Sequence, residues 1–223
     1  MLILTVVLLQ QPPVGLNSAT LRLLVASGII GIGIGDTLYF AALNQLGPRR
    51  ALLMETLAPP MAAILALVFL GETLNLSSWI GIMLTLLGVI WVISERVPQP
   101  AGVVPELSYP GILLGGVAAL GQATGAVLSR AALADTAVGP LWSTLIRLLG
   151  GLAIMLGLLH WQSQRGVQLR SLRSPRVIGG VALAAFLGTY LALYLQQTAL
   201  KYSATGIAQA LTSTSPLFVL PLA

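Results

Sequence analysis

Residues 31–60 read GIGIGDTLYFAALNQLGPRRALLMETLAPP, and a related stretch begins 157 residues later. Over the 36 residues that start at Gly31 and at Gly188, an ungapped alignment gives 8 identities. Leu and Ala matches arise easily in so apolar a chain, so the aligned glycines and the proline pair Pro59 and Pro216 carry most of the weight. In each copy an apolar segment, a short polar break and a second apolar segment with a mid-helix proline follow one another. Paired segments with Gly and Pro interruptions at corresponding positions predict a repeat-built membrane transporter.

The composition predicts that the lipid bilayer surrounds this chain. Charged residues make up 8%, apolar residues 57%, and the mean hydropathy is +0.94. A soluble domain carries about 25% charged residues, so these side chains cannot cover a water-facing surface. The net charge of +5 comes mainly from arginines at segment ends and in loops, which favours lipid headgroups, and no basic stripe with aromatics indicates nucleic acid. The absence of cysteine excludes disulfides and thiolate metal sites, and we expect no metal or cofactor.

A spanning helix needs roughly 20 mostly apolar residues. Six segments of about that length predict an all-α integral membrane fold: 21–46, 51–70, 77–94, 109–133, 138–160 and 177–200. A seventh, 204–223, runs to the chain end, and 1–10 resembles the tail of another.

The repeat offset predicts the domain organisation. We expect a first repeat at 1–97, a polar and proline-rich linker at 98–108, and a second repeat at 109–223. Subtracting 157 from 109 gives −48, so one helix and most of the next are expected before Met1, with a further part after Ala223. The intact architecture would have two five-helix halves and ten spans, of which about seven and a stump are present. An odd number of spans in each half forces the second half to be inverted.

The order and spacing of several motifs resemble the EamA-type domain of the drug/metabolite transporter superfamily. The motifs are Leu38-Tyr39-Phe40-Ala41-Ala42-Leu43, Leu57-Ala58-Pro59, Leu70-Gly71-Glu72, Trp79-Ile80-Gly81 with Gly88-Val89, Trp142-x4-Arg147, Gln197-Thr198-Ala199-Leu200 and Ser215-Pro216. The resemblance implies ten helices around a central cavity that opens alternately to each side. It also implies a multi-pass protein of the bacterial inner membrane that moves amino acids, metabolites or drugs, often outward.

Three charged residues lie inside predicted spans: Asp36, Glu55 and Arg147. An ionised group at a helix centre costs about 2.5–3.5 kcal/mol on insertion scales, so one that is present usually faces a cavity or a partner. Asp36 or Glu55 is therefore a candidate proton or cation site, and Arg147 a candidate partner for one of them or for an anionic group. Measured along the helix axes from the turn at 47–50, Asp36 lies about 18 Å deep and Glu55 about 9 Å deep. Tyr39 lies closer to Glu55 in depth.

Two of these residues have specific structural alternatives. Arg147 could be a strut bonded to backbone carbonyls. Glu55 could be an interfacial charge, which a helix N-terminus favours.

Pro59, Pro60 and Pro216 each remove a backbone N–H donor and free the carbonyl four residues back. For Pro59 and Pro216 these carbonyls belong to Glu55 and Thr212. Irregular backbone inside a bilayer is tolerated only where protein or a water-filled cavity satisfies it. We therefore expect both helices beside the central pathway, with a simple packing kink as the alternative.

Polar residues elsewhere in the spans extend the candidate pathway. Gln122, Tyr190 and Gln197 join it, and the wider set comprises Thr124, Tyr194, Gln196, Gln209 and Ser213. Amides, hydroxyls and aromatics suit a small zwitterionic or amphipathic solute. Interfacial anchoring and contacts between helices are the alternatives for each.

The sequence favours a secondary transporter that exports a small organic solute by alternating access, with a proton as the candidate coupling ion. An enzyme is not indicated, because His160 is the only histidine and no Gly-x-Ser-x-Gly motif occurs. The alternative is a membrane structural or assembly protein, or an inactive truncated product.

Overall fold

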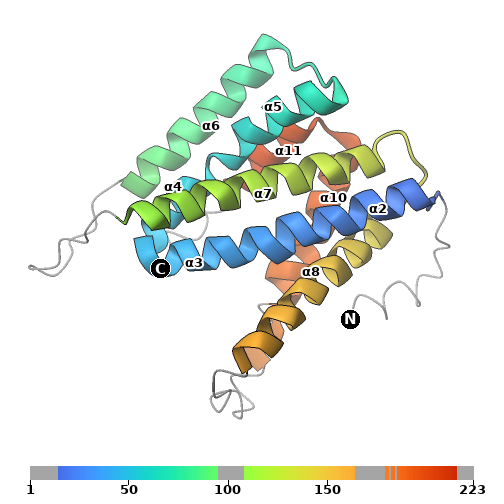
Figure 1. Ribbon diagram of the computed structural model, residues 1–223. Helices are drawn as coiled ribbons and strands as arrows, with labels where there is room; N and C mark the ends of the chain where they lie inside the picture. The colour runs from blue at the N-terminus through green and yellow to red at the C-terminus, as the bar shows by residue number, and fades with distance from the viewer. Residues whose placement is uncertain (1–14, 95–107, 164–178, 181, 184, 215–223) are drawn as a thin grey trace, which may run out of the picture.

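The computed structural model of the protein describes residues 15–94, 108–163, 179–180, 182–183 and 185–214 (Figure 1). The described residues form helices and the turns between them, without a strand. In chain order the helices are α2 (Ser18–Ser27), η1 (Gly28–Asp36), α3 (Thr37–Leu46), α4 (Pro48–Glu55), α5 (Ala58–Leu70), α6 (Leu76–Ser94), α7 (Tyr109–Leu133), α8 (Pro140–Ser163), η3 (Ala185–Leu191), α10 (Ala192–Tyr202) and α11 (Thr205–Thr212), where η marks a π-helix.

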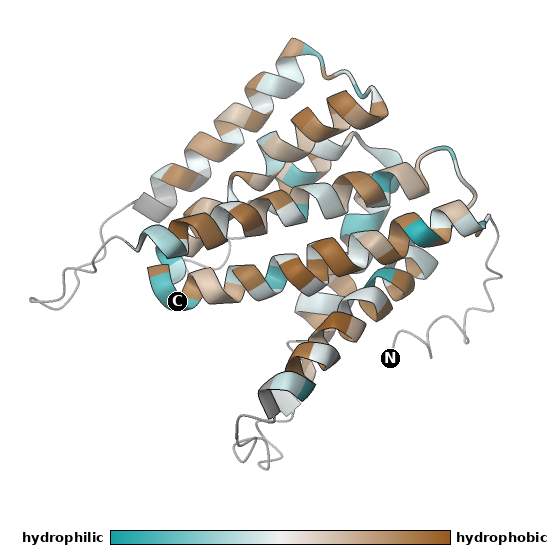
Figure 2. Cartoon of the chain, viewed as in Figure 1, coloured by the Kyte–Doolittle hydropathy of each residue, from teal (hydrophilic) through white to brown (hydrophobic). Residues whose placement is uncertain are grey.

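Small side chains fill the interior of the bundle and large apolar ones cover its outside. Ala42, Ala62 and Ala123 are fully buried, whereas Phe69 and Trp91 are 72% and 77% exposed. Large apolar residues therefore face outward along the helices, and Figure 2 shows that hydrophobic residues run along the length of the helices. So extensive a cover of large apolar residues indicates a lipid environment, and small residues allow helices to approach one another in lipid. This arrangement confirms the predicted all-α integral membrane fold.

Four of the described helical segments are long and apolar enough to cross a bilayer, namely Ser18–Leu46, Pro48–Leu70, Tyr109–Leu133 and Pro140–Trp161. They correspond to the predicted spans 21–46, 51–70, 109–133 and 138–160. The predicted span 77–94 is the 19-residue helix α6. The segment 177–200 corresponds in its described part to η3 and α10, and 204–223 to α11, while 1–10 lies outside the described residues.

Helix η1 packs closely against α7. A Cβ added to Gly125 would lie 2.9 Å from the Cα of Gly31, and one added to Gly121 would lie 3.4 Å from the Cα of Gly35. Two pairs of glycines, each four residues apart, therefore face each other across the contact. This is the close approach that small residues permit in membranes.

The two copies of the repeat run in opposite directions. The end of α3 lies beside the start of α7, where Ser108 Oγ donates to Gln45 Oε1 over 3.0 Å. The end of α10 lies beside the other end of α7, where Arg130 Nη1 donates to the carbonyls of Leu200 and Lys201 over 2.9 and 2.8 Å. Because α3 and α10 are corresponding helices, the second half is inverted, as the odd number of predicted spans required.

The 157-residue offset also appears in the helix boundaries. The π-helix η1 begins at Gly28 and η3 at Ala185, while α4 covers 48–55 and α11 covers 205–212. Both short helices end in the same pair of backbone hydrogen bonds. In the first copy, Thr56 N donates to Leu52 O (3.2 Å) and Leu57 N to Met54 O (3.1 Å). In the second, Ser213 N donates to Gln209 O (3.0 Å) and Thr214 N to Leu211 O (3.2 Å). The repeat thus reproduces a helix end as well as a sequence pattern.

Candidate functional site

The ends of helices α4 and α11 meet at one polar cavity. About 120 Å³ of space opens between the C-terminal ends of α4 and α11 and the middle of α7. Its lining residues are Leu52, Glu55, Thr56, Ala58, Gln122, Gln196, Gln209, Thr212 and Ser213. Since a polar cavity is unusual inside an apolar bundle and irregular backbone there needs protein or a water-filled cavity to satisfy it, this is the candidate functional site.

Asp36 is the last residue of η1 and lies next to the cavity without lining it. Gln122 Nε2 on α7 donates to Asp36 Oδ1 over 2.5 Å. Because Gln122 also lines the cavity, it connects the carboxylate to the cavity wall. Asp36 also interacts electrostatically with Arg147 on α8 and with Glu55.

Glu55 occupies a different place from the one its structural alternative requires. It is the last residue of α4, at the C-terminal end of a helix, and it lines the cavity. The interpretation as a charge at a helix N-terminus is therefore wrong, because the break that precedes Pro59 ends the helix at Glu55. The Tyr39 hydroxyl on α3 donates a hydrogen bond to the Glu55 carboxylate. This contact agrees with the depths estimated from the sequence, which placed Tyr39 close to Glu55.

Arg147 is buried between η1 and α8 and is 2% exposed. Among the described residues, its Nε and Nη1 atoms have no hydrogen-bond partner, so neither of these two atoms forms the strut to backbone carbonyls that was the structural alternative. Its Nη2 atom lies where Gly31 leaves room, since a Cβ on that glycine would come within 3.3 Å of it. Asp36 is its electrostatic partner, and Arg147 does not line the cavity.

The break in the first copy falls where the prolines predict it. Helix α4 ends at Glu55 and α5 begins at Ala58, followed at once by Pro59 and Pro60. Pro59 is fully buried and lies beside the cavity wall formed by Ala58. Pro216, the corresponding residue of the second copy, lies outside the described residues.

Two predicted pathway residues lie away from this cavity. Tyr190 in η3 stacks on Phe186, with 5.3 Å between ring centroids. Gln197 is fully buried and accepts a 2.6 Å hydrogen bond from Ser143 Oγ on α8. Its neighbour Gln196 lines the cavity instead.

The pathway set named above omitted Thr56 and Thr212. Thr56 corresponds to Ser213 at the 157-residue offset, so a hydroxyl occupies the same position after the break in both copies. That shared hydroxyl was the sequence signal for this part of the site.

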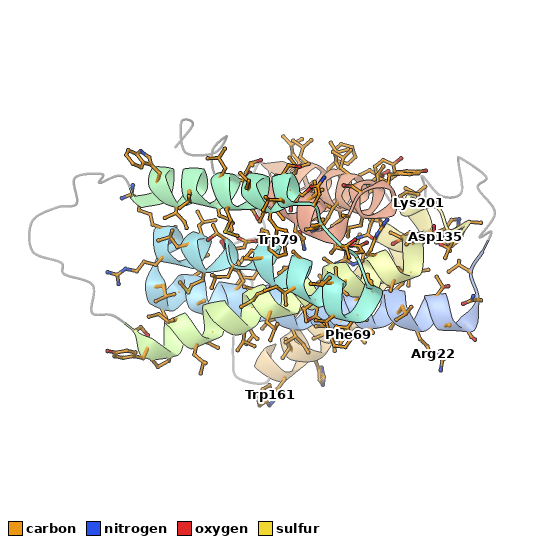
Figure 3. All side chains as sticks on the ribbon, turned by 90° about the horizontal axis from the view of Figure 1, so that it is seen from above. Arg22, Phe69, Trp79, Asp135, Trp161 and Lys201 are labelled. Carbon is orange, nitrogen blue, oxygen red and sulfur yellow. The ribbon has the colours of Figure 1, made fainter. Side chains whose placement is uncertain are left out.

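A second polar cluster ties the two copies together near one end of the bundle. Arg130 Nε donates to Glu72 Oε1 over 2.5 Å, and the Thr205 N–H at the start of α11 donates to Glu72 Oε2 over 2.9 Å. Partial burial opposes ionisation of Glu72, but these hydrogen bonds outweigh it and hold the pKa of the carboxyl below its ordinary value. Lys201 and Asp135 lie at the same end, together with Arg22 (Figure 3).

The geometry defines an inverted-repeat membrane protein with a polar cavity where its broken helices meet. The family model of the EamA-like transporter family matches residues 1–94 and 109–223, and the chain belongs to this family. It is therefore an integral, multi-pass membrane protein of a transporter family. No curated protein matches the chain significantly. The described residues contain no group of His, Cys, Asp and Glu side chains that could hold a metal ion.

Proposed function

We propose that the protein is a secondary transporter that moves a small organic solute outward by alternating access between its two inverted halves. The observation that carries the proposal is the cavity at the matched helix breaks. One wall comes from α4 and α5 of the first copy and another from α10 and α11 of the second. A rocking of one copy against the other would therefore change access to the cavity from each side.

We further propose that a proton is the coupling ion and that Asp36 holds it. The groups that face Asp36 are Arg147 on α8, Gln122 on α7, and Glu55 and Tyr39 on its own side of the bundle. Asp36 thus interacts with the guanidinium of Arg147 and with the like charge of Glu55, and one proton would balance these three charges. Because Gln122 touches both Asp36 and the cavity, a change in the charge of Asp36 would reach the solute site.

Transport by the purified chain in liposomes tests both statements. We expect efflux of at least one solute from a panel of amino acids, small metabolites and organic amines, driven by a pH gradient. Replacing Asp36 by Asn should abolish the response to the pH gradient. Transport that is unchanged in Asp36→Asn would remove Asp36 from the mechanism, and a correctly inserted protein that moves no solute with or without the gradient would favour a structural or assembly role.

The bacterial inner membrane is the location that we propose, and the family resemblance supports it.

A further inference from the structure

We propose that the cavity binds the ammonium group of a small organic amine, with Glu55 as its counter-ion. This inference rests on the proposed transport function and names the substrate class of the same site. It is drawn from the hydrogen-bond donors and acceptors that line the cavity, from the ends of the two broken helices, and from the placement of the charges.

The hydroxyl groups of the cavity present oxygen rather than hydrogen. Thr56 Oγ1 donates to Leu53 O over 2.7 Å. Thr212 Oγ1 and Ser213 Oγ donate to Gln209 O over 2.9 and 3.0 Å. Each hydroxyl has a single proton, and here each proton is directed to an oxygen of its own helix. Their lone pairs are what a ligand would meet.

The amides reinforce this excess of acceptors. Gln122 turns its NH₂ end to Asp36, and Gln196 turns its NH₂ end to Gln209 Oε1. The oxygen ends of Gln122 and Gln196 therefore have no partner in these contacts. Together with the Glu55 carboxylate and the hydroxyl oxygens, they outnumber the one remaining amide donor group, the NH₂ of Gln209, so the cavity wall has more acceptors than donors. A ligand rich in N–H donors complements such a wall.

The backbone at the break adds to the negative potential. Helices α4 and α11 both end at the cavity, and a helix C-terminus carries a partial negative charge from its free carbonyls. The carbonyls of Glu55 and Thr56 would normally bond the N–H groups four residues on, but those residues are Pro59 and Pro60, which have none. The same two prolines remove N–H groups from the start of α5, so its positive end is weakened.

The charge of the lining residues and the size of the cavity indicate which kind of cation it holds. Among the described residues, Glu55 lines the cavity and no arginine or lysine does. Arg147 is buried elsewhere, so the carboxylate of a zwitterion would have no cationic partner in the cavity. The space of about 120 Å³ equals roughly four water molecules at about 30 Å³ each. It fits an ammonium group with a short carbon chain better than it fits a bare metal ion.

Equilibrium binding to the full chain in detergent at neutral pH tests the site, with n-butylammonium as the probe. We expect n-butanol and butyrate, which also have four carbon atoms but carry a neutral or an anionic head, to bind at least tenfold more weakly. Replacing Glu55 by Gln should weaken n-butylammonium binding about tenfold or more, since it removes a charge-assisted hydrogen bond. Glu55→Asp, which keeps the charge, should lose less.

Asp135→Asn is the matched control, and its affinity should stay within about twofold of the unmodified protein. Asp135 is an exposed residue of the α7–α8 turn with φ 55°, a conformation that asparagine also adopts readily. The comparison among the three small molecules uses the unmodified protein, so it holds even if Glu55→Gln does not fold.

Equal binding of the alcohol, an unchanged affinity in a folded Glu55→Gln, or sodium binding as tightly as n-butylammonium would overturn the inference. The liposome experiment separates it from the proposed function. Transport of other solutes without preference for amines would refute the ammonium site and leave the transporter. Selective binding of n-butylammonium without any transport would refute the transporter and leave the site.

Discussion

Replacing Gly125 by Ala should push apart η1, which ends at Asp36, and α7, which carries Gln122. The added Cβ would lie 2.9 Å from the Cα of Gly31 and 3.2 Å from the carbonyl oxygen of Ser27, both backbone atoms that no rotamer change can move. Carbon atoms rest at about 3.5–4.0 Å, so η1 must retreat from α7 by about 0.6–1.1 Å. Overpacking of this kind costs about 1–3 kcal/mol. Gln122 lies one helical turn before Gly125 on α7. The same shift should therefore lengthen the hydrogen bond that Gln122 donates to Asp36.

The measurement is the free energy of unfolding in mixed micelles, followed by far-UV circular dichroism as denaturing detergent is added. Gly116→Ala on the same helix is the matched control, because a Cβ there meets nothing within 4 Å. Its only expected effect is the better helix propensity of alanine, up to about 1 kcal/mol in the stabilising direction. Gly125→Ala should therefore be less stable than Gly116→Ala by at least about 1 kcal/mol. Equal stabilities would refute the close contact of η1 with α7.

Two further predictions concern the charged residues. Asp36→Asn and Arg147→Gln should each lower the free energy of unfolding, because each single change leaves a buried charge without its partner. The double variant should lose about 1 kcal/mol less stability than the sum of the two single losses. Strictly additive losses would show that the two side chains do not interact. Glu72 has a folded pKa below its ordinary value of 4.5, so the stability it contributes is present above that value and is lost as the pH falls through the lowered pKa. Unfolding measured between about pH 3 and 6 should show a loss on acidification that Glu72→Gln lacks, and an identical acid profile in the two proteins would contradict this role for the cluster with Arg130 and Thr205.

Much of the fold could be predicted because the requirements of a membrane span are visible in the sequence. A run of apolar residues bounded by a turn defines a span, and 109–133 coincides with α7. The break before Pro59 could also be predicted, since a proline lacks the N–H that would continue the helix. Inversion of the second half followed from counting spans, and the positions of Leu46 and Leu200 at opposite ends of α7 bear it out.

The composition of the site could be predicted only in part, because it depends on which face of each helix turns inward. Neighbouring residues such as Gln196 and Gln197 point about 100° apart on a helix, and packing alone decided that Gln196 lines the cavity. Depth along the chain separated Asp36 from Glu55, yet the two carboxylates interact electrostatically across the helix contact. The π-helix η1, which ends at Asp36, has no signal in apolar periodicity, since it is a local change in hydrogen bonding.

The two copies share a backbone but differ in charge. At the 157-residue offset, Glu55 corresponds to Thr212 and Asp36 to Leu193. The inverted scaffold brings two equivalent helix ends to one cavity, and their partial charges reach it from opposite sides. The charged side chains, however, are distributed unequally. Asp36 and Glu55 belong to the first copy, and Arg147 lies on α8 in the second. If the cavity binds the proposed cation, Glu55 makes the first copy hold it more strongly than the second. In the proposed alternating-access mechanism the cation should then stay with α4 when the copies move apart, so the geometry of its release depends on which side is open.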